Sequence, residues 1–276
     1  MRSLLFSLLV CFGVQVCAGD GAKRPNILLI TTDQQFADVM GCAGSEWVQT
    51  PAMDAIAKRG VRFPNAYVNY PVCMPERYTM YTGRLPCTRR QADAEHKPVI
   101  SLGNQARQAG YTTAYFGKWH IQDQTFSSKD KKNHGFDHYS GGKDESMTDD
   151  AVAWFGKTLR KPFLAVVSYY NPHDICEWGR KKSGWTDRIR MRNGEVMTDP
   201  HLERCPPLPD NFEINGDESE AVAERRRSEK KGVPNAQKMA TEWSREDWRQ
   251  YRWAYNRLVD KVDTQIGRLL KALAAE

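Results

Sequence analysis

The sequence has 276 residues, of which 40% are hydrophobic, and this is enough to form one sizeable α/β domain or two smaller domains. Beyond the N-terminal segment no stretch is long and apolar enough to cross a bilayer, which excludes a membrane span in that part of the sequence. The formal net charge of +6 suits anionic substrates without identifying one.

The first element in the chain is a targeting segment. Arg2 supplies a positive charge, residues 4–16 are mostly apolar, and residues 16–18 resemble a small-residue cleavage site. The apolar run is too short to be a membrane span. We therefore expect residues 1–18 to be a secretory signal peptide that is cleaved after Ala18. The mature protein is then expected to be exported, periplasmic or extracellular, and without membrane attachment.

The next elements have the patterns of a strand and a helix. Residues 26–31 form a short apolar run without helical periodicity, which is typical of a buried central strand, and the run leads to Asp33. Residues 50–60 place a threonine and a proline at the start and a glycine at the end, the order expected of a capped helix.

The segment 73–83 has the form C-x-P-x-R-x-x-x-x-T-G. Pro75 suits the first turn of a helix and Gly83 its end, so Cys73 should lie just ahead of a short helix whose free N–H groups attract anions. Arg77 follows four residues later, near the same helix face, where a permanent cation can stabilise negative charge. Taken alone, the pattern also fits a buried free cysteine beside a surface arginine.

Three later segments complete an alternating pattern. Residues 98–110 have the character of a helix, while residues 111–116 and 163–169 are rich in β-forming residues. Strands that alternate with helices predict an α/β fold with a doubly wound, mostly parallel sheet flanked by helices. In such open sheets the functional groups lie beyond the carboxyl ends of the strands.

Candidate functional groups follow both of these strands. Lys118 and His120 come directly after the first, and His173 comes after the second. A protonated lysine can bind an oxyanion, and two histidines can exchange protons with a substrate. A lone histidine is more often a structural residue, and we expect that role for His134 and His138.

The pattern weakens after the second of these strands. Asp174 and Glu177 are expected either to recognise substrate or to hydrogen-bond the loop. Residues 180–244 are expected to form a surface insertion, in which residues 217–231 are densely charged. A nucleic-acid-binding patch is the alternative reading of those charges. Acidic residues are interleaved among the basic ones and the chain is expected to be exported, so no nucleic-acid partner is predicted.

Near the end of the chain, apolar residues recur at helical spacing, which predicts a core-facing helix rather than an aromatic platform for sugars. They are Trp248, Tyr251, Tyr255, Leu258, Val262, Ile266 and Leu269.

Taken together, the motifs resemble those of the type I, formylglycine-dependent sulfatases of the alkaline phosphatase-like superfamily. The resemblance rests on the C-x-P-x-R segment and on residues 24–27, 117–120, 171–173 and 262–267, which occur in the order that this family uses. It implies the superfamily's α/β fold. It also implies that a formylglycine-generating enzyme oxidises Cys73 to formylglycine, whose hydrated aldehyde attacks the sulfate ester.

The resemblance also implies a calcium ion, held by Asp33, by the modified Cys73 and by later acidic residues. Many relatives have a second aspartate where this chain has Gln34, whose amide oxygen could coordinate the ion or only line the pocket. The later acidic loop and a further catalytic lysine are absent from the sequence. We therefore expect residues 23–276 to be the N-terminal part of a sulfatase domain, incomplete on its C-terminal side.

The expected catalytic set is Cys73, Arg77, Lys118, His120 and His173, acting on a sulfated small molecule or polysaccharide. Lys118 would bind sulfate oxygen, one histidine would accept the proton of the formylglycine hydrate, and the other would bind sulfate or donate to the leaving oxygen. Two alternatives remain open. One is a phosphodiesterase or phosphonate monoester hydrolase of the same superfamily, and the other is a catalytically inactive fragment.

Overall fold

The computed structural model describes residues 24–85, 100–121, 134–157, 162–184, 194, 196–213, 219–227 and 243–275. The predicted signal peptide at residues 1–18 lies outside the described residues.

A parallel sheet forms the centre of the described structure. Its four strands lie in the order β1-β4-β2-β3, and every pairing is parallel. The strands are β1 (Ile27–Asp33), β2 (Thr112–Gly117), β3 (His138–Ser140) and β4 (Phe163–Pro172). The three strands expected from the sequence are confirmed. The sequence did not predict β3, because a three-residue strand carries too short a pattern to be recognised.

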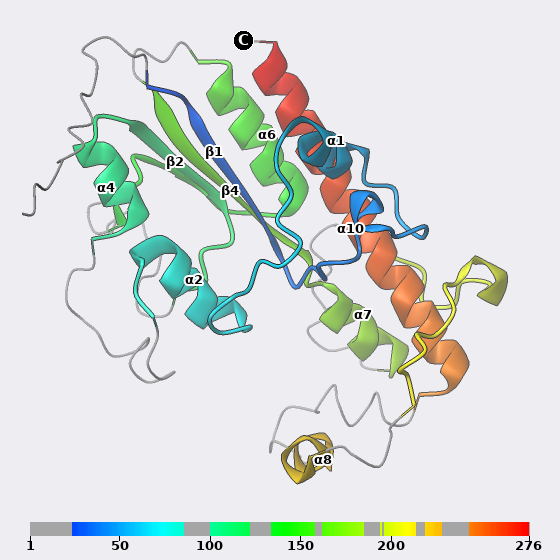
Figure 1. The fold of residues 1–276 in the computed structure, drawn as a ribbon. Helices are drawn as coiled ribbons and strands as arrows, with labels where there is room; N and C mark the ends of the chain where they lie inside the picture. The colour runs from blue at the N-terminus through cyan, green and yellow to red at the C-terminus, as the bar shows by residue number, and fades with distance from the viewer. Residues whose placement is uncertain are drawn as a thin grey trace, which may run out of the picture.

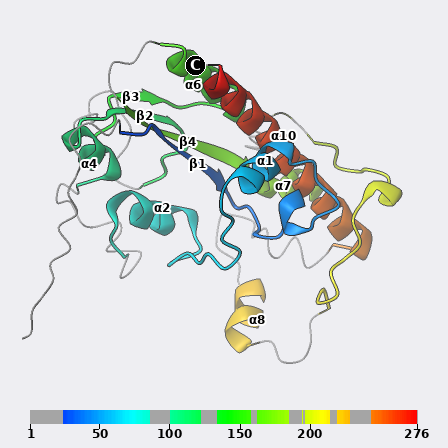
Figure 2. The same cartoon turned by 45° about the horizontal axis from the view of Figure 1, so that its top comes forward.

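Helices cover both faces of the sheet (Figure 1). They are α1 (Pro51–Arg59), α2 (Cys73–Thr82), α4 (Leu102–Gln108), α6 (Asp144–Phe155), α7 (Ile175–Lys182), α8 (Glu220–Arg227) and α10 (Arg245–Ala274), with short 3-10 helices at Gly41–Ala43 and Leu202–Arg204. Helices α1, α6 and α10 lie on one side, and α2 and α4 lie on the other, as the turned view also shows (Figure 2). The predicted doubly wound architecture is confirmed.

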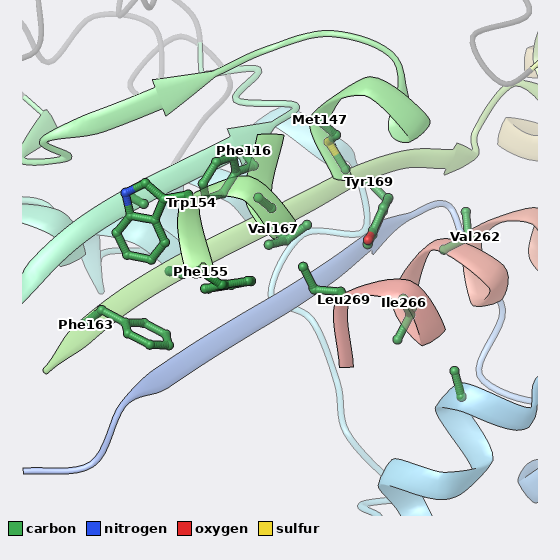
Figure 3. Close-up of a cluster of buried hydrophobic side chains, with 14 of the residues drawn as sticks. Phe116, Met147, Trp154, Phe155, Phe163, Val167, Tyr169, Val262, Ile266 and Leu269 are labelled. Atoms are coloured by element: carbon green, nitrogen blue, oxygen red, sulfur yellow. The ribbon is translucent and has the colours of Figure 1, made fainter. Parts of the chain in front are cut away.

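Successive residues of β4 face opposite layers. Phe163, Val167 and Tyr169 pack against α6 and α10, together with Phe116 of β2 (Figure 3). Leu164 and Val166 belong instead to the cluster on the other face, together with aromatic side chains of α2. Because both faces of this central strand are covered, it has a continuous apolar sequence rather than an alternating one.

Helix α10 begins with a capping box, in which Ser244 and Asp247 satisfy each other's backbone N–H groups. The predicted core-facing stripe is confirmed for its last five members, which are buried, while Trp248 and Tyr251 are half-buried. Although α10 has 30 residues, neither it nor any other described helix is apolar enough over a sufficient length to span a membrane.

Helix α1 is capped differently from the sequence expectation. Thr50 makes no side-chain capping bond, and its hydroxyl instead accepts the N–H of Gly41. Asp263 of α10 accepts the N–H groups of Ala52 and Met53, 3.0 and 2.8 Å away, and therefore caps α1 from a distant part of the chain. The helix expected over 98–110 begins at Leu102 within the described residues, because Ser101 is its N-cap.

Part of the expected insertion at 180–244 is described. Arg249 of α10 donates hydrogen bonds to the carbonyl oxygens of Leu202, Cys205 and Pro206, which fixes this stretch against the helix. Whether 180–244 is an insertion over the site stays a prediction.

Candidate active site

The candidate site lies where β1, β2 and β4 approach their carboxyl ends. Asp33 is the last residue of β1, Lys118 directly follows β2, and Ser168 lies in β4 beside Gly117. The parallel register brings these three positions together, although they are far apart in the sequence. Arg77 reaches the same place from α2, which packs on this face of the sheet.

A buried cluster of charges forms the centre of the site. The Oδ2 atom of Asp33 lies 2.9 Å from Arg77 Nη2 and 2.9 Å from Lys118 Nζ. All three residues are at most 5% exposed. Burial by itself raises the pKa of Asp33, but the attraction of Lys118 and Arg77 outweighs it, and the pKa is lowered below its ordinary value. The site therefore holds one carboxylate and two cations, with a net positive charge.

Arg77 is fixed by further hydrogen bonds. Its Nη1 atom donates to the backbone oxygen of Lys118 at 2.6 Å and to Ser168 Oγ at 2.7 Å. The Ser168 hydroxyl donates in turn to the Lys118 oxygen at 2.9 Å and accepts from Thr31 Oγ1 at 3.1 Å. Sequence reasoning missed Ser168, because a serine inside an apolar strand shows its role only once the strand register is known.

Two tyrosine side chains help to fix the backbone of Lys118. The Tyr115 hydroxyl donates to the Lys118 carbonyl oxygen at 2.5 Å and lies 3.1 Å from the Tyr81 hydroxyl. Burial raises the pKa of Tyr115 well above its ordinary value, so the hydroxyl stays a donor. Gly117 has a φ of +97°, a conformation that favours glycine. A Cβ atom at this position would also lie 2.1 Å from the Ser168 backbone oxygen, so a larger residue would not fit.

Cys73 is the first residue of α2, whereas the sequence predicted a position just ahead of the helix. Arg77 lies one turn further along α2. The Cys73 thiol is free and half-buried. Val72 at the N-cap makes no side-chain hydrogen bond to the first turn of the helix. The carboxylate of Glu76 accepts from the N–H groups of Asn69 and Tyr70 and holds the loop before the helix. Arg77, one turn after Cys73, forms an ion pair with Asp33.

His120 and His173 flank the charge cluster. His120 is exposed and His173 is half-buried. The pKa of His120 is lowered by partial desolvation, Lys118 and Arg77, against the opposing effect of Asp33. The pKa of His173 is lowered by burial and Lys118, while Asp33 opposes the shift. Both shifts favour the neutral imidazole, which can accept a proton.

His134 and His138 have different surroundings. The rings of His134 and Trp119 lie 5.9 Å apart, and the ring of His138 is stacked 6.4 Å from that of Trp154. His134 Nδ1 also accepts the N–H of Phe136. These contacts place both histidines among the aromatic side chains of the core.

Gln34 and His120 are the two non-glycine residues with positive φ in the described part of the chain, at 65° and 48°. Such backbone conformations are strained for residues with a side chain, and they are often found at functional sites. The Gln34 carbonyl accepts from the Tyr255 hydroxyl at 2.7 Å, and its amide oxygen accepts from Cys176 Sγ at 3.6 Å.

A second buried carboxylate, which sequence reasoning missed, holds the segment before His173. Asp144 accepts from the N–H groups of Tyr170 and Asn171 at 2.8 and 3.1 Å. The Asn171 side chain also donates to Asp174 Oδ2, so Asp174 hydrogen-bonds the loop, which is one of the two roles expected for it. The only sequence signal for Asp144 is its place in an acidic first helical turn.

Asp33 and Gln34 are the candidate ligands for a divalent cation. A carboxylate and an amide oxygen are the hard donors that calcium prefers, so the chemistry of the pair fits. The donor set is partial, because no group of three or more His, Cys, Asp or Glu side chains in the described ranges could hold a metal ion. Calcium takes six to eight oxygen ligands, which these two residues cannot supply alone.

Comparison with known proteins identifies the family of the chain. The family model described as Sulfatase matches residues 25–276. The chain is 27% identical over 294 residues to a Delta 4,5-hexuronate-2-O-sulfatase of Bacteroides thetaiotaomicron, covering 95% of this chain and 55% of the relative. It is 32% identical over 187 residues to an ulvan-active sulfatase of Formosa agariphila, covering 56% of this chain and 36% of the relative.

Two solved structures share the fold. A 2-O GAG sulfatase superposes with a TM-score of 0.69 at 24% identity, covering 92% of this chain and 55% of the other. A phosphonate monoester hydrolase of Agrobacterium radiobacter superposes with a TM-score of 0.62 at 21% identity, covering 91% and 60%. The chain thus spans about half the length of the curated relatives and solved structures that it matches over most of its own length. Since the family model matches nearly the whole chain, the protein belongs to the sulfatase family, within the alkaline phosphatase-like superfamily.

Proposed function

We propose that the protein hydrolyses sulfate esters with a formylglycine nucleophile made from Cys73. The observation that carries this proposal is the buried cluster of Asp33, Arg77 and Lys118, in which Arg77 lies on the same helix as Cys73 and one turn beyond it. The cluster supplies net positive charge, and the N-cap residue of α2 makes no side-chain hydrogen bond to the first turn that contains Cys73. Both features favour an anionic group near residue 73.

Formylglycine at position 73 would supply a hydrated aldehyde that attacks sulfur with one hydroxyl and releases sulfate once the other is deprotonated. The chain's own residues prepare the surroundings for this chemistry. Lys118 and Arg77 neutralise negative charge on the sulfate oxygens, and Asp33 keeps both cations oriented. Because Ser168 and Tyr115 fix the Lys118 backbone, the cations need little reorganisation during reaction.

His120 and His173 are proposed to transfer protons. Their lowered pKa values leave both imidazoles neutral at pH 7, so either can accept the proton of the attacking hydroxyl. The imidazolium formed in this way can then donate that proton to the leaving oxygen. Asp144 and Asn171 fix the backbone just before His173 and so keep it near the cluster.

Asp33 and Gln34 are proposed to hold calcium, together with ligands beyond the described residues. The ion would add positive charge against the sulfate oxygens. Maturation would require an oxidising formylglycine-generating enzyme as a partner, which converts the Cys73 side chain from CH2SH to CHO.

The proposed substrate is a sulfated carbohydrate. This proposal is supported by the names of relatives, among them the hexuronate and ulvan sulfatases above and an N-acetylglucosamine-6-O-sulfatase of Bacteroides thetaiotaomicron that is 32% identical over 146 residues. The expected signal peptide supports action outside the cytoplasm, on a polysaccharide or on its fragments. No described residue is assigned to the sugar itself.

A phosphonate monoester hydrolase is the second candidate. It is favoured by the shared fold with the Agrobacterium radiobacter enzyme and by glutamine at position 34, beside the first candidate ligand. Sulfate and phosphonate monoesters are both tetrahedral anions, so the same charge cluster suits either of them.

The test is to produce the protein together with a formylglycine-generating enzyme. Mass spectrometry of the Cys73 peptide should show the CH2SH to CHO change, and the product should hydrolyse an aryl sulfate faster than an aryl phosphonate monoester. Cys73→Ala should abolish turnover and keep the fold, as judged by circular dichroism. Faster phosphonate hydrolysis would favour the second candidate. Full activity with an unmodified thiol would reject the mechanism, and no turnover after complete conversion would indicate an inactive chain.

A further inference from the structure

The hydroxyl of Tyr255 bridges two backbone groups beside the candidate cation ligands. It donates to the carbonyl oxygen of Gln34 at 2.7 Å and accepts the N–H of Phe36 at 2.9 Å. Tyr255 lies 221 residues after Gln34, so this contact is tertiary and could not be found from local sequence. One phenol therefore satisfies both ends of the turn that directly follows Asp33.

The phenol is held firmly in place. Tyr255 is 4% exposed, its ring lies 4.9 Å from that of Phe36, and it belongs to the buried cluster with Leu258 and Val259. Its position is set by α10, whose capping box and buried stripe fix the helix against the sheet.

Other residues of α10 contact the chain that follows Gln34. Arg257 donates to the Trp47 carbonyl oxygen, Asp260 accepts the Gln49 N–H at 2.7 Å, and Asp263 caps α1. Together with Tyr255, these residues brace the segment 34–53 at four points. The contact at Gln34 is the one that lies next to the candidate site.

Gln34 needs such support because of its backbone. Its φ of 65° is in the left-handed region, which disfavours residues that carry a Cβ atom. A strained conformation persists only where its surroundings hold it. The Gln34 side chain is exposed, and its amide oxygen accepts one weak contact from Cys176 Sγ at 3.6 Å.

We propose that Tyr255 is a positioning residue, whose hydroxyl holds the turn at Gln34–Phe36 so that Gln34 stays beside Asp33 as a ligand for the divalent cation. The inference rests on the proposed function for the identity of the ligand. The positioning itself rests on the two hydrogen bonds and on the strained φ, and it can be measured without any turnover.

The test variant is Tyr255→Phe, which keeps the ring and removes only the hydroxyl. Tyr169→Phe is the matched control. Tyr169 is also a buried tyrosine that packs against α10, but its hydroxyl lies 3.3 Å from that of Thr148 of α6. Both variants remove one buried phenolic hydroxyl from the same side of the sheet.

The first measurement is hydrogen exchange of the Phe36 amide by NMR, in protein free of calcium. Removal of its acceptor in Tyr255→Phe should speed exchange about fivefold, the usual scale of one net hydrogen bond. The control should leave the Phe36 amide unchanged. An unchanged Phe36 rate in Tyr255→Phe, or an equal increase in both variants, would overturn the positioning claim.

The second measurement is aryl sulfate hydrolysis as a function of calcium concentration, in the formylglycine form. Tyr255→Phe should raise the calcium concentration for half-maximal rate about fivefold while the rate at saturating calcium stays within about twofold. A merely structural role would instead lower the saturating rate or change nothing. An unchanged calcium dependence would overturn the role toward the cation. If the parent protein shows no turnover at all, the proposed function fails and the amide exchange alone decides the positioning.

Discussion

The Nζ atom of Lys118 lies 2.9 Å from Oδ2 of Asp33, although both side chains are almost completely buried. The backbone oxygen of Lys118 also accepts hydrogen bonds from Arg77, Ser168 and Tyr115. Lys118 is therefore fixed at both its charged end and its backbone. Because a buried charge is costly without a partner, changes on either side of this pair should have large effects.

Asp33→Asn should lower the free energy of unfolding by about 3–5 kcal/mol, because it leaves Lys118 and Arg77 buried without a carboxylate. Asp149→Asn is the control, since its ion pair with Arg268 is exposed and should contribute less than about 1 kcal/mol. Urea unfolding at pH 7 measures both. The lowered pKa of Asp33 means that its contribution is present at neutral pH and is lost as the pH falls below about 3.8. Equal midpoints for the two variants would contradict the buried charge cluster.

His120→Ala and His173→Ala should each reduce kcat for an aryl sulfate about a hundredfold, the scale of a positioned acid or base. His201→Ala is the control, because His201 is exposed and precedes a short 3-10 helix. Steady-state rates of the formylglycine form would show the difference. If both site variants keep near-normal rates, these histidines are structural.

The rate should stay high below the ordinary histidine pKa of 6.5. Desolvation and Lys118 lower the pKa of both His120 and His173, so protonation, which removes the base, requires a lower pH than usual. We expect the acid limb of kcat/KM to lie below pH 6.5, and NMR titration of the imidazoles should show the same midpoints. Midpoints at or above 6.5 would argue against the positive surroundings described here.

Gly117→Ala should destabilise the protein by about 2–5 kcal/mol, since its Cβ atom would meet Ser168 O at 2.1 Å and Met147 Sδ at 2.3 Å. Gly44→Ala is a matched control, because Gly44 has a similar φ of +102° but no atom within 4 Å of a Cβ. It should cost only about 1–2 kcal/mol of backbone strain. Thermal unfolding of both variants separates the steric effect from the conformational one.

Asp263→Ala should cost about 1–2 kcal/mol through loss of the cap on α1. Asp263→Asn should cost less, because burial raises the pKa of this carboxyl and the amide keeps an acceptor without a buried charge. Faster hydrogen exchange at Ala52 and Met53 in Asp263→Ala would locate the effect at the first turn. Unchanged exchange there would mean that Asp263 does not cap the helix.

The sequence predicted the parts of this fold that depend on local pattern. The strands at 26–31, 111–116 and 163–169 were found because buried parallel strands are continuous apolar runs, and Asp33 and Lys118 were found because they follow such runs. Cys73 and Arg77 were found because the C-x-P-x-R spacing is itself a local pattern.

The remaining features depend on contacts between distant segments. Ser168 contacts Arg77 only because the register of β4 with β2 places it there, and Asp263 caps a helix more than 200 residues earlier in the chain. The positive φ of Gln34 has no local signature either, since glutamine is not a residue that favours it. Helices α6 and α7 were not predicted, and their boundaries became clear only in the structure.

The alternation along β4 makes the length of this strand as important as its composition. Val167 and Tyr169 pack under α10, while Ser168 between them binds Arg77. Insertion or deletion of a single residue upstream in the strand would turn Ser168 into the hydrophobic layer and present Val167 or Tyr169, respectively, to the cations. Among related chains, gaps within this strand should therefore be absent or come in pairs, so that strand length is under as much constraint as the reactive residues.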